Sequence, residues 1–434
     1  MICYTSSMSK PTIAVVSFPG NNCEFESLRA IARSGMTPMF FRWNEDRAKL
    51  KDVDGYFLVG GFSYEDRGRS GMVAARDPLM EFIGQEAEAG KVVIGNCNGA
   101  QILVESGLIP LDHELQMSLA RNVIHTKEGF ESPGFMSEWV WIKPGCGKDR
   151  CATSDWGETA RGERSRTMHL PIAHGEGRFI TEDADVIAQL KKDRQLAFQY
   201  CDAAGNVSED PAMTPNGSMF ALAGVCNPAG NVIALMPHPE RTNNGKPYFD
   251  SMRVWIETKG RTARAASKTT PAGKAEPLNV RSAQGIEIFI DTIIVNNEER
   301  TVEQTAKKFA PALKLKQWKY LMTKDREPTE ILSDLSVFNA NKERAYVRRG
   351  TKLYRWDATT KCEDPLTDAK KREIFSGVSI LRRDLPDTGS DSLGRGGESG
   401  ICYTVTGVSE AGLRTQRLLE VFGNPHASTL EKMS

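Results

Sequence analysis

One cysteine of the chain stands where a nucleophile would be useful. Cys97 lies in the centre of GNCNG (95–99), directly after the apolar run 91–96 and before an amphipathic segment. A sharp strand-to-helix turn of this kind lifts a side chain beyond the sheet edge and places it at a helix N-terminus, where partial positive charge favours thiolate over thiol. The pattern predicts that Cys97 is a nucleophile, and the competing interpretation is a buried loop cysteine.

A nucleophilic thiol needs a base and a group that orients the base. Of the six histidines, His238 stands out because it follows an apolar run and is flanked by Pro237 and Pro239. Glu240 is close enough in sequence to accept a hydrogen bond from the imidazole. We therefore predict a catalytic triad of Cys97, His238 and Glu240. Taken alone, the HPE sequence could also be a turn histidine with an accidental glutamate.

The other cysteines give no sign of a metal site. The chain has nine cysteines, an odd number, with no CxxC pair and no cysteine-histidine cluster at zinc-like spacing. We expect reduced thiols and no metal ion. Cys23 is the one to watch, because SFPGNNCE follows the first expected strand much as GNCNG follows a later one.

The elements that must position these residues can be read from the apolar periodicity. Short strand-like runs alternate with helical patterns over residues 1–258, and this order predicts an α/β fold with a doubly wound, mostly parallel sheet. The expected strands are 12–18, 37–43, 55–61, 91–96, 138–144, 170–179, 196–202, 220–228 and 232–238, and the expected helices include 23–35 and 77–90.

The pattern changes after residue 258. Residues 259–281 are rich in Ala, Thr, Lys and Pro and are predicted to be a linker, and 282–434 are predicted to form a smaller α+β module. From Arg261 onward the chain has 29 basic and 23 acidic residues, which leaves 27 and 33 for the first part, so the two parts carry about +6 and −6. This asymmetry also indicates two modules.

The composition excludes several classes of protein. The chain is 40% hydrophobic and 26% charged, with a net charge of zero, which gives no support for nucleic-acid binding. Its apolar runs are shorter than the roughly 20 residues of a membrane helix. The first residues do not resemble a secretory signal, so we expect a cytoplasmic protein that starts at Met1 or Met8.

Five separated motifs narrow the interpretation of the first part. They are VVSFPGNNCEFE, GGFSYEDRGRSG, IGNCNGAQIL, PIAHGEGRF and MPHPER. With Cys97, His238 and Glu240 in this order, the sequence resembles the class I, triad-type glutamine amidotransferases. Within that class it is similar to the glutaminase subunits of phosphoribosylformylglycinamidine synthase. The similarity covers about residues 12–259.

The resemblance implies a mechanism and a set of binding residues. It implies hydrolysis of L-glutamine to glutamate and ammonia through a glutamyl thioester on Cys97. Backbone N–H groups near Gly61 and Phe62, and that of Asn98, would stabilise the oxyanion, while Gln101 and His174 would line the glutamine pocket. Gln101 could instead be a solvent-facing helix residue. Glu65 departs from the small residue common in GGFSYGD, which leaves the conformation of the oxyanion loop open.

The resemblance also implies partners. In the family, ammonia passes to a synthase subunit that uses ATP and magnesium to make formylglycinamidine ribonucleotide in purine biosynthesis. This chain has no GxxxxGK[ST] loop, so we expect no cofactor in it. The module 282–434 loosely resembles the small subunit that bridges the glutaminase and the synthase in this family, and an unrelated extension is an equal alternative. No nucleic-acid or membrane partner is expected.

Two further alternatives remain from other classes. The chain could be a non-catalytic assembly subunit that has kept the fold, although Cys97, His238 and Glu240 are all present. It could also be a glutaminase for a different synthase, or a peptidase-like cysteine enzyme on the same type of sheet. The GGFSY and HGEGRF motifs argue against these, by resemblance only.

Overall fold

The computed structural model describes residues 10–110, 114–127, 129–156, 167–259, 278–282, 284–390 and 393–434. It divides into two compact units, Met1–Thr269 and Thr270–Ser434. Most of the linker predicted over 259–281 lies outside the described residues. Its end was placed too late, because Asn279–Arg281 form strand β14, which pairs in parallel with β22 (Ser428–Met433). A short edge strand with two exposed residues has no apolar pattern that the sequence could display.

The first unit is built on a sheet that has nine strands within the described residues, in the order β2-β1-β3-β4-β13-β12-β11-β8-β9. Strands β2, β1, β3, β4 and β13 are parallel, and β12, β11, β8 and β9 extend the sheet in antiparallel pairs. The strands are β1 (Thr12–Ser17), β2 (Thr37–Arg42), β3 (Gly55–Leu58), β4 (Val92–Asn96), β8 (Met136–Pro144), β9 (Met168–His174), β11 (Phe198–Cys201), β12 (Leu222–Cys226) and β13 (Val232–Leu235).

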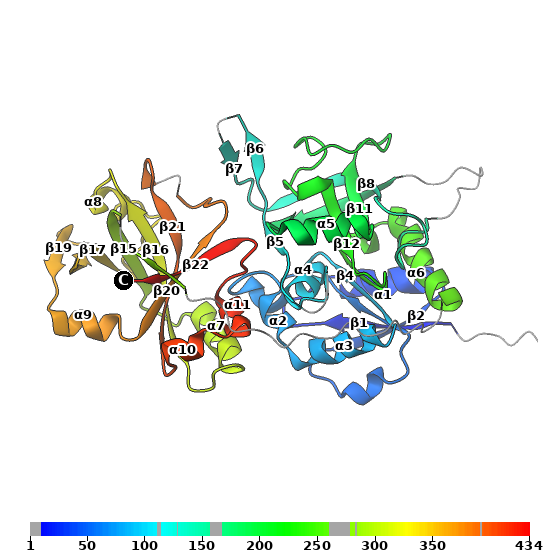
Figure 1. Cartoon of the computed structure of the whole chain (residues 1–434), viewed down its shortest axis with the longest axis horizontal. Coiled ribbons are helices and arrows are strands. Elements are labelled where there is room, and N and C mark those ends of the chain that lie inside the picture. The colour runs from blue at the N-terminus through cyan, green and yellow to red at the C-terminus, as the bar shows by residue number, and fades with distance from the viewer. Residues whose placement is uncertain are drawn as a thin grey trace, which may run out of the picture. The chain divides into compact units, whose positions relative to one another are not determined.

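Helices cover both faces of this sheet (Figure 1). In β1, Ile13 and Val15 belong to the core that includes residues of α1 and α6, whereas Ala14 and Val16 belong to the core with α3, α4 and α5. Because successive strand residues point to opposite faces, one apolar strand supplies both cores. The prediction of a doubly wound α/β fold is confirmed. The helices are α1 (Glu24–Arg33), α3 (Pro78–Glu88), α4 (Asn98–Glu105), α5 (Ala184–Lys192) and α6 (Lys246–Lys259).

Some elements of the first unit differ from the expectation. The single strand predicted over 170–179 is two strands, β9 and β10 (Glu176–Ile180), with Gly175 between them. Strand β10 leaves the main sheet and pairs with β5 (Ser118–Arg121). Short elements that the periodicity did not reveal are α2 (Met72–Ala75), β6 (Ile124–Thr126) and β7 (Gly129–Glu131).

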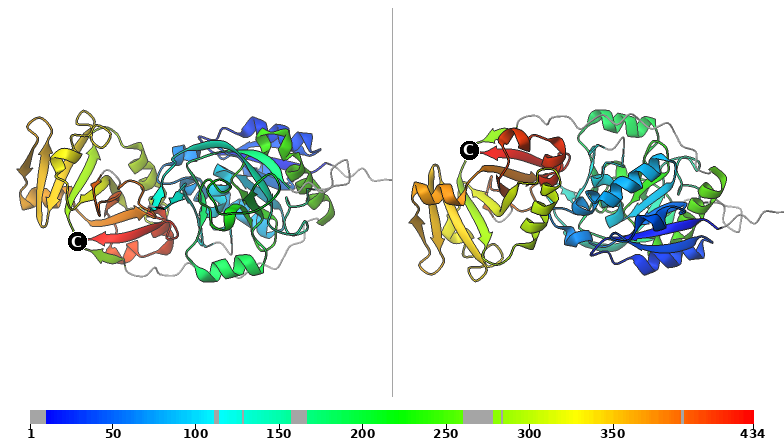
Figure 2. Two further views of the ribbon diagram at one scale, coloured as in Figure 1. Left: turned by 90° about the horizontal axis from the view of Figure 1, so that it is seen from above. Right: turned by 90° about the horizontal axis from the view of Figure 1, so that it is seen from below.

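The second unit also contains a sheet with nine strands in its described part, in the order β14-β22-β20-β21-β16-β15-β17-β18-β19, and Figure 2 shows it from two further sides. Its pairs are antiparallel except for β14 with β22. The remaining strands are β15 (Ile286–Thr292), β16 (Lys314–Thr323), β17 (Glu343–Arg349), β18 (Lys352–Asp357), β19 (Cys362–Pro365), β20 (Val378–Asp384) and β21 (Glu398–Thr406).

The two faces of the second sheet carry different cores. Ile288 and Ile290 pack with residues of α8 (Pro328–Ile331), whereas Phe289 packs with Trp318 and with the residues at the end of α9 (Asp368–Ile374). The other helices are α7 (Asn297–Lys307), α10 (Glu410–Leu413) and α11 (Gln416–Phe422). The α+β prediction is confirmed. None of the described helices is both long and apolar enough to cross a bilayer.

Candidate active site

Cys97 occupies the junction between β4 and α4 in a strained conformation. Its φ of 51° and ψ of −108° lie outside the regions that L-residues prefer, at a cost on the order of 1–3 kcal/mol. A Cβ on Gly95 would lie 2.3 Å from the Gly99 carbonyl oxygen, and one on Gly99 would lie 2.1 Å from the Leu58 carbonyl oxygen. Only glycine therefore fits on either side of the cysteine, since a side chain would push the turn away from the sheet.

The Cys97 thiol is buried against the end of β9. The residue is 4% exposed, and its Sγ lies 3.6 Å from the carbonyl oxygen of Ala173. Its backbone N–H donates to the Leu235 carbonyl at 2.8 Å, which fixes the turn to β13. Contacts with the neighbouring strands β9 and β13 therefore help to maintain the strained conformation of Cys97.

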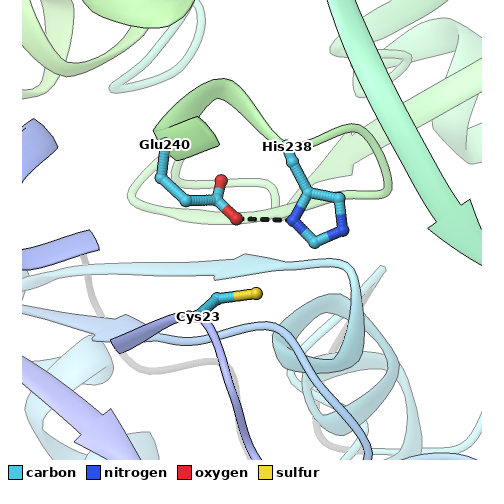
Figure 3. Close-up of side chains that lie close together, drawn as sticks. All are labelled: Cys23, His238 and Glu240. Carbon is cyan, nitrogen blue, oxygen red and sulfur yellow. Dashed lines mark hydrogen bonds and ion pairs between the residues drawn. The ribbon is translucent and has the colours of Figure 1, made fainter. Parts of the chain in front are cut away.

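His238 and Glu240 form a buried pair beside this turn (Figure 3). His238 Nδ1 is 2.5 Å from Glu240 Oε1. Burial acts to lower the pKa of the imidazole, but the Glu240 carboxylate and then the thiols of Cys97 and Cys23 raise this pKa well above its ordinary value. Burial likewise opposes ionisation of Glu240, yet His238 keeps the pKa of that carboxyl low. An imidazolium-carboxylate pair is the form that this geometry favours.

Two residues that the sequence analysis missed hold the carboxylate of Glu240. Asn96 Nδ2 donates to Glu240 Oε2 at 3.1 Å, and the Tyr248 hydroxyl donates to Asn96 Oδ1 at 3.2 Å. Glu240 is therefore fixed from β4 and from α6. Asn96 could have been found as the polar residue that ends an otherwise apolar strand next to Cys97.

Cys23 is a further thiol at the same histidine. It is fully buried at the start of α1, and Arg241 Nη2 donates to its Sγ at 3.0 Å. One potential ligand atom from each of Cys23, His238 and Glu240 lies within 4.8 Å of the others, and these types of side chain can bind zinc (Figure 3). The guanidinium of Arg241 already supplies positive charge to this thiol.

The loop after β3 carries the predicted oxyanion donors. The Phe62 N–H donates to the Gly20 carbonyl at 3.0 Å, and the Ser63 N–H donates to Asn98 Oδ1 at 3.0 Å. The N–H groups of Gly61 and Asn98 are the better candidates, because Asn98 opens α4, where the first N–H groups have no intrahelical acceptor. The Phe62 N–H is already bonded to the Gly20 carbonyl, and the Phe62 ring is 42% exposed.

Gln101 and His174 are both buried near this loop. Gln101 is 4% exposed, so it does not face solvent, and it accepts from Asn98 Nδ2 at 2.9 Å while donating to the Glu176 carbonyl at 2.6 Å. Burial, and then the charge of His238, lower the pKa of His174 to about 3, so its ring is neutral. A Cβ on Gly177 would lie 2.2 Å from that ring, which explains the second glycine of HGEG.

Two carboxylates of the same region were not singled out from the sequence. Burial, and then the charge of Glu176, raise the pKa of Asp66 to about 7. Asp66 Oδ1 accepts from Asn98 Nδ2 at 3.3 Å, and Glu176 Oε2 accepts from the Ser70 N–H at 3.0 Å. Both residues belong to motifs that the sequence analysis used, GGFSYED and HGEGRF. The motifs could therefore have indicated these two carboxylates, but only the structure shows what they contact.

Glu65 occupies a position that favours glycine. Tyr64, Glu65 and Asp66 have φ values of 52°, 58° and 53°, and the Glu65 carboxylate points outward to Arg67 at 2.9 Å. We expect Glu65→Gly to raise the free energy of unfolding by about 1 kcal/mol, because glycine adopts this φ without steric cost. Urea unfolding measures the change. Glu65→Ala is the control that removes the ion pair but keeps the strain, and equal stability of the two variants would contradict the prediction.

The fold and the Cys97 turn define a class of protein, and similarity to known proteins identifies this class. Residues 10–248 match the family model of the CobB/CobQ-like glutamine amidotransferase domain, and the chain belongs to this family. The match ends before the second unit. Among individual relatives, the chain is 39% identical over 261 residues to the phosphoribosylformylglycinamidine synthase subunit PurQ of Methanothrix thermoacetophila, which covers 56% of this chain and 98% of the relative.

A second PurQ subunit and one solved structure are also similar to this chain. The PurQ subunit of Thermomicrobium roseum is 40% identical over 228 residues, covering 52% of this chain and 86% of the relative. A chain in the solved structure of PurLQS from Thermotoga maritima is 30% identical, with a TM-score of 0.43, and the match covers 57% of this chain and 99% of that chain. The first unit is thus the glutamine amidotransferase component of a phosphoribosylformylglycinamidine synthase.

Proposed function

We propose that the first unit hydrolyses L-glutamine through Cys97, His238 and Glu240 and supplies the ammonia for synthesis of formylglycinamidine ribonucleotide. The observation that carries this proposal is the strained, buried Cys97 turn beside the His238–Glu240 pair, with Nδ1 and Oε1 2.5 Å apart. A thiol, a base and a group that orients the base are the parts that acyl transfer to cysteine requires.

In the first half of the reaction, Cys97 Sγ attacks the side-chain amide carbon of glutamine. The carbonyl oxygen becomes an oxyanion, which the N–H groups of Gly61 and Asn98 stabilise, at about 3–4 kcal/mol per donor in comparable sites. The imidazolium of His238 then gives its Nε2 proton to the departing nitrogen. The C–N bond breaks, ammonia leaves, and a glutamyl thioester remains on Cys97.

In the second half, water replaces ammonia. Neutral His238 takes a proton from the water, whose oxygen attacks the thioester carbon, and the C–S bond breaks to release glutamate and the Cys97 thiolate. Glu240 holds Nδ1 throughout, because Asn96 fixes the other carboxylate oxygen at 3.1 Å. The raised pKa of His238 favours the imidazolium that the first half needs.

The ammonia must reach a second active site before water protonates it. We propose that it passes to a synthase subunit that binds ATP and magnesium, by analogy with the relatives named PurQ and the assembly named PurLQS. The test is co-purification of the chain with this subunit. Glutamine-dependent formation of formylglycinamidine ribonucleotide by the complex, and none by the synthase subunit alone, is the expected result. A full rate without this chain would contradict the proposal.

Asp66 and Glu176 provide the negative charge that the α-ammonium of glutamine needs. The charge of Glu176 raises the pKa of Asp66. Asn98 donates a hydrogen bond to the Asp66 carboxylate, and Gln101 donates one to the backbone carbonyl of Glu176. Hydrogen bonds to charged groups contribute about 1.5–3 kcal/mol each. We therefore place the amino-acid end of glutamine between these carboxylates and its amide at Cys97.

Asp66→Asn tests this placement. We expect KM for glutamine to rise about tenfold or more while kcat changes little, because the lost charge acts on binding. Since the pKa of Asp66 is about 7, kcat/KM of the wild type should fall as the pH drops through 7, and this fall should disappear in the variant. Steady-state kinetics from pH 6 to 9, with the exposed neighbour changed as Glu65→Gln for a control, measure both. An unchanged KM would refute the placement.

A further inference from the structure

A cavity of about 520 Å³ opens on the face of the second sheet that α9 covers. Small-molecule sites typically measure about 300–1,000 Å³. Alternate residues of two strands that flank β15 form its floor, since Lys314, Lys316 and Trp318 come from β16 and Arg344 and Tyr346 from β17. Because these side chains alternate along strands of one sheet, the cavity is a property of the fold.

The lining of this cavity, which we call the β16–α9 cavity, is strongly cationic. Five basic side chains face two carboxylates, an excess of three positive charges, and these residues are Lys314, Lys316, Arg344, Arg355 and Lys370 against Asp291 and Glu373. Like charges that share a concave surface focus a positive potential and attract anions. The cavity is therefore suited to a ligand with more than one negative charge.

Structural ion pairs account for part of this charge. Asp291 is 3% exposed, and Lys316 Nζ and Arg344 Nη2 approach its oxygens at 2.5 and 3.2 Å. Glu299 Oε2 also lies 3.5 Å from Lys316 Nζ, so two carboxylates balance these two cations. On α9, Lys370 pairs with Glu373 at 2.7 Å, one helical turn away, and this pair is neutral.

Two cations of the lining have no such partner. Lys314 and Arg355 form no salt bridge within the described part of the chain, although their charges act on Glu303 and Asp357, respectively, and both cations are exposed. They come from different strands, β16 and β18, which converge on one cavity. Surface lysines and arginines usually point into free solvent, whereas these two line one concave space and account for its excess positive charge.

The rest of the lining offers an apolar wall and hydroxyl groups. Trp318 is held by Phe375, whose ring centroid is 5.1 Å away, so the end of α9 is anchored over the sheet. The remaining lining residues are the apolar Leu315, Tyr346, Leu366 and Ile374 and the hydroxyl-bearing Ser376, Thr404 and Thr406. A ligand that combines an anionic group with an apolar or ring-containing part would use both kinds of surface.

We propose that the β16–α9 cavity binds a phosphorylated small molecule of the mononucleotide type. Its phosphate oxygens bind Lys314, Arg355 and the Lys316–Arg344 pair, and its uncharged part lies along the apolar wall. Lysine and arginine are the side chains that bind phosphate in proteins. The proposal concerns the second unit alone and does not depend on the glutaminase mechanism of the first.

Isothermal titration calorimetry of the full-length chain tests this proposal. The probes are AMP, adenosine, pyrophosphate and inorganic phosphate, each without magnesium. We expect AMP to bind at least tenfold more tightly than adenosine or inorganic phosphate. The double variant Lys314→Ala/Arg355→Ala should weaken AMP binding at least tenfold. Lys352→Ala, an exposed cation of β18 outside the cavity lining, is the matched control and should leave binding unchanged.

Several outcomes would overturn the proposal. Equal affinity for AMP and adenosine would show that the phosphate is not recognised. Equal weakening by the double variant and by Lys352→Ala would indicate general surface charge, and undiminished binding to the double variant would place the ligand elsewhere. Tighter binding of pyrophosphate than of AMP would contradict the role of the apolar wall. Cys97→Ser should bind AMP like the wild type, which separates this site from the first unit.

Discussion

Cys97→Ser should lower the glutaminase rate of the complex by at least about 10³-fold. A hydroxyl group, which ionises far less readily than a thiol, then replaces the nucleophile at the strained turn. The synthase reaction driven by added ammonia should continue, since this route bypasses the first unit. Glutamate release in the presence of the synthase subunit measures the first effect. Rapid acid quenching and mass spectrometry should detect a glutamyl adduct on Cys97 of the wild type.

The exposed cysteine of the second unit provides the matched control. Cys362→Ser should keep the full glutaminase rate, because Cys362 lies in β19, outside the unit that holds the triad. If Cys97→Ser kept a rate within tenfold of the wild type, or if the glutamyl adduct formed on another cysteine, the proposed mechanism would be wrong. Cys23 is the other thiol at His238, so the mass of the Cys23 peptide decides between the two.

The first unit could be predicted from sequence because its local patterns agree with its tertiary structure. The parallel strands are buried on both faces, so their runs are apolar throughout, and the expected 91–96 strand is β4 from Val92 to Asn96. Strand ends were less predictable. Residues 170–179 are apolar enough for one strand, but the chain turns at Gly175 and β10 pairs with β5, a partner distant in sequence.

In the second unit, the fold class was easier to predict from the sequence than the individual elements. Its α+β class was predicted for residues 282–434, whereas β14, β19 and β22 have little signal in the sequence, because each lies at or near the sheet margin and has mixed or exposed residues. Helix α9 also has little signal in the sequence, since none of its residues is buried. Such elements are stabilised by tertiary pairing and ion pairs, which leave little periodicity in the sequence.

Within the site, the sequence indicated the reacting groups better than the residues that hold them. Cys97, His238 and Glu240 were proposed from residue type and spacing, and the structure brings His238 and Glu240 into contact at 2.5 Å. The contributions of Asn96 and Cys23 depend on contacts across 144 and 218 positions of sequence. No local pattern encodes such contacts, so they became visible only in three dimensions.

Glu240→Gln should reduce the glutaminase rate by about 10²–10⁴-fold, in the range known for the orienting carboxylates of other triads. The amide keeps the size of the side chain and removes its charge. Without that charge the pKa of His238 falls, so less imidazolium is present to protonate departing ammonia, and the pH of maximal activity should move downward. The pH profile of glutamate release at saturating glutamine measures both effects. Glu240→Asp keeps the charge and should recover part of the rate.

The same variant has a defined effect on stability. The folded pKa of His238 is raised, so its stabilising contribution is complete below the ordinary pKa of 6.5 and disappears as the pH rises through the folded value. The folded pKa of Glu240 is lowered, so its contribution is complete above 4.5 and disappears on acidification. The difference in Tm between the wild type and Glu240→Gln should therefore be largest between about pH 4.5 and 6.5. A difference that grew steadily toward pH 9 would show that the two residues do not form a charged pair.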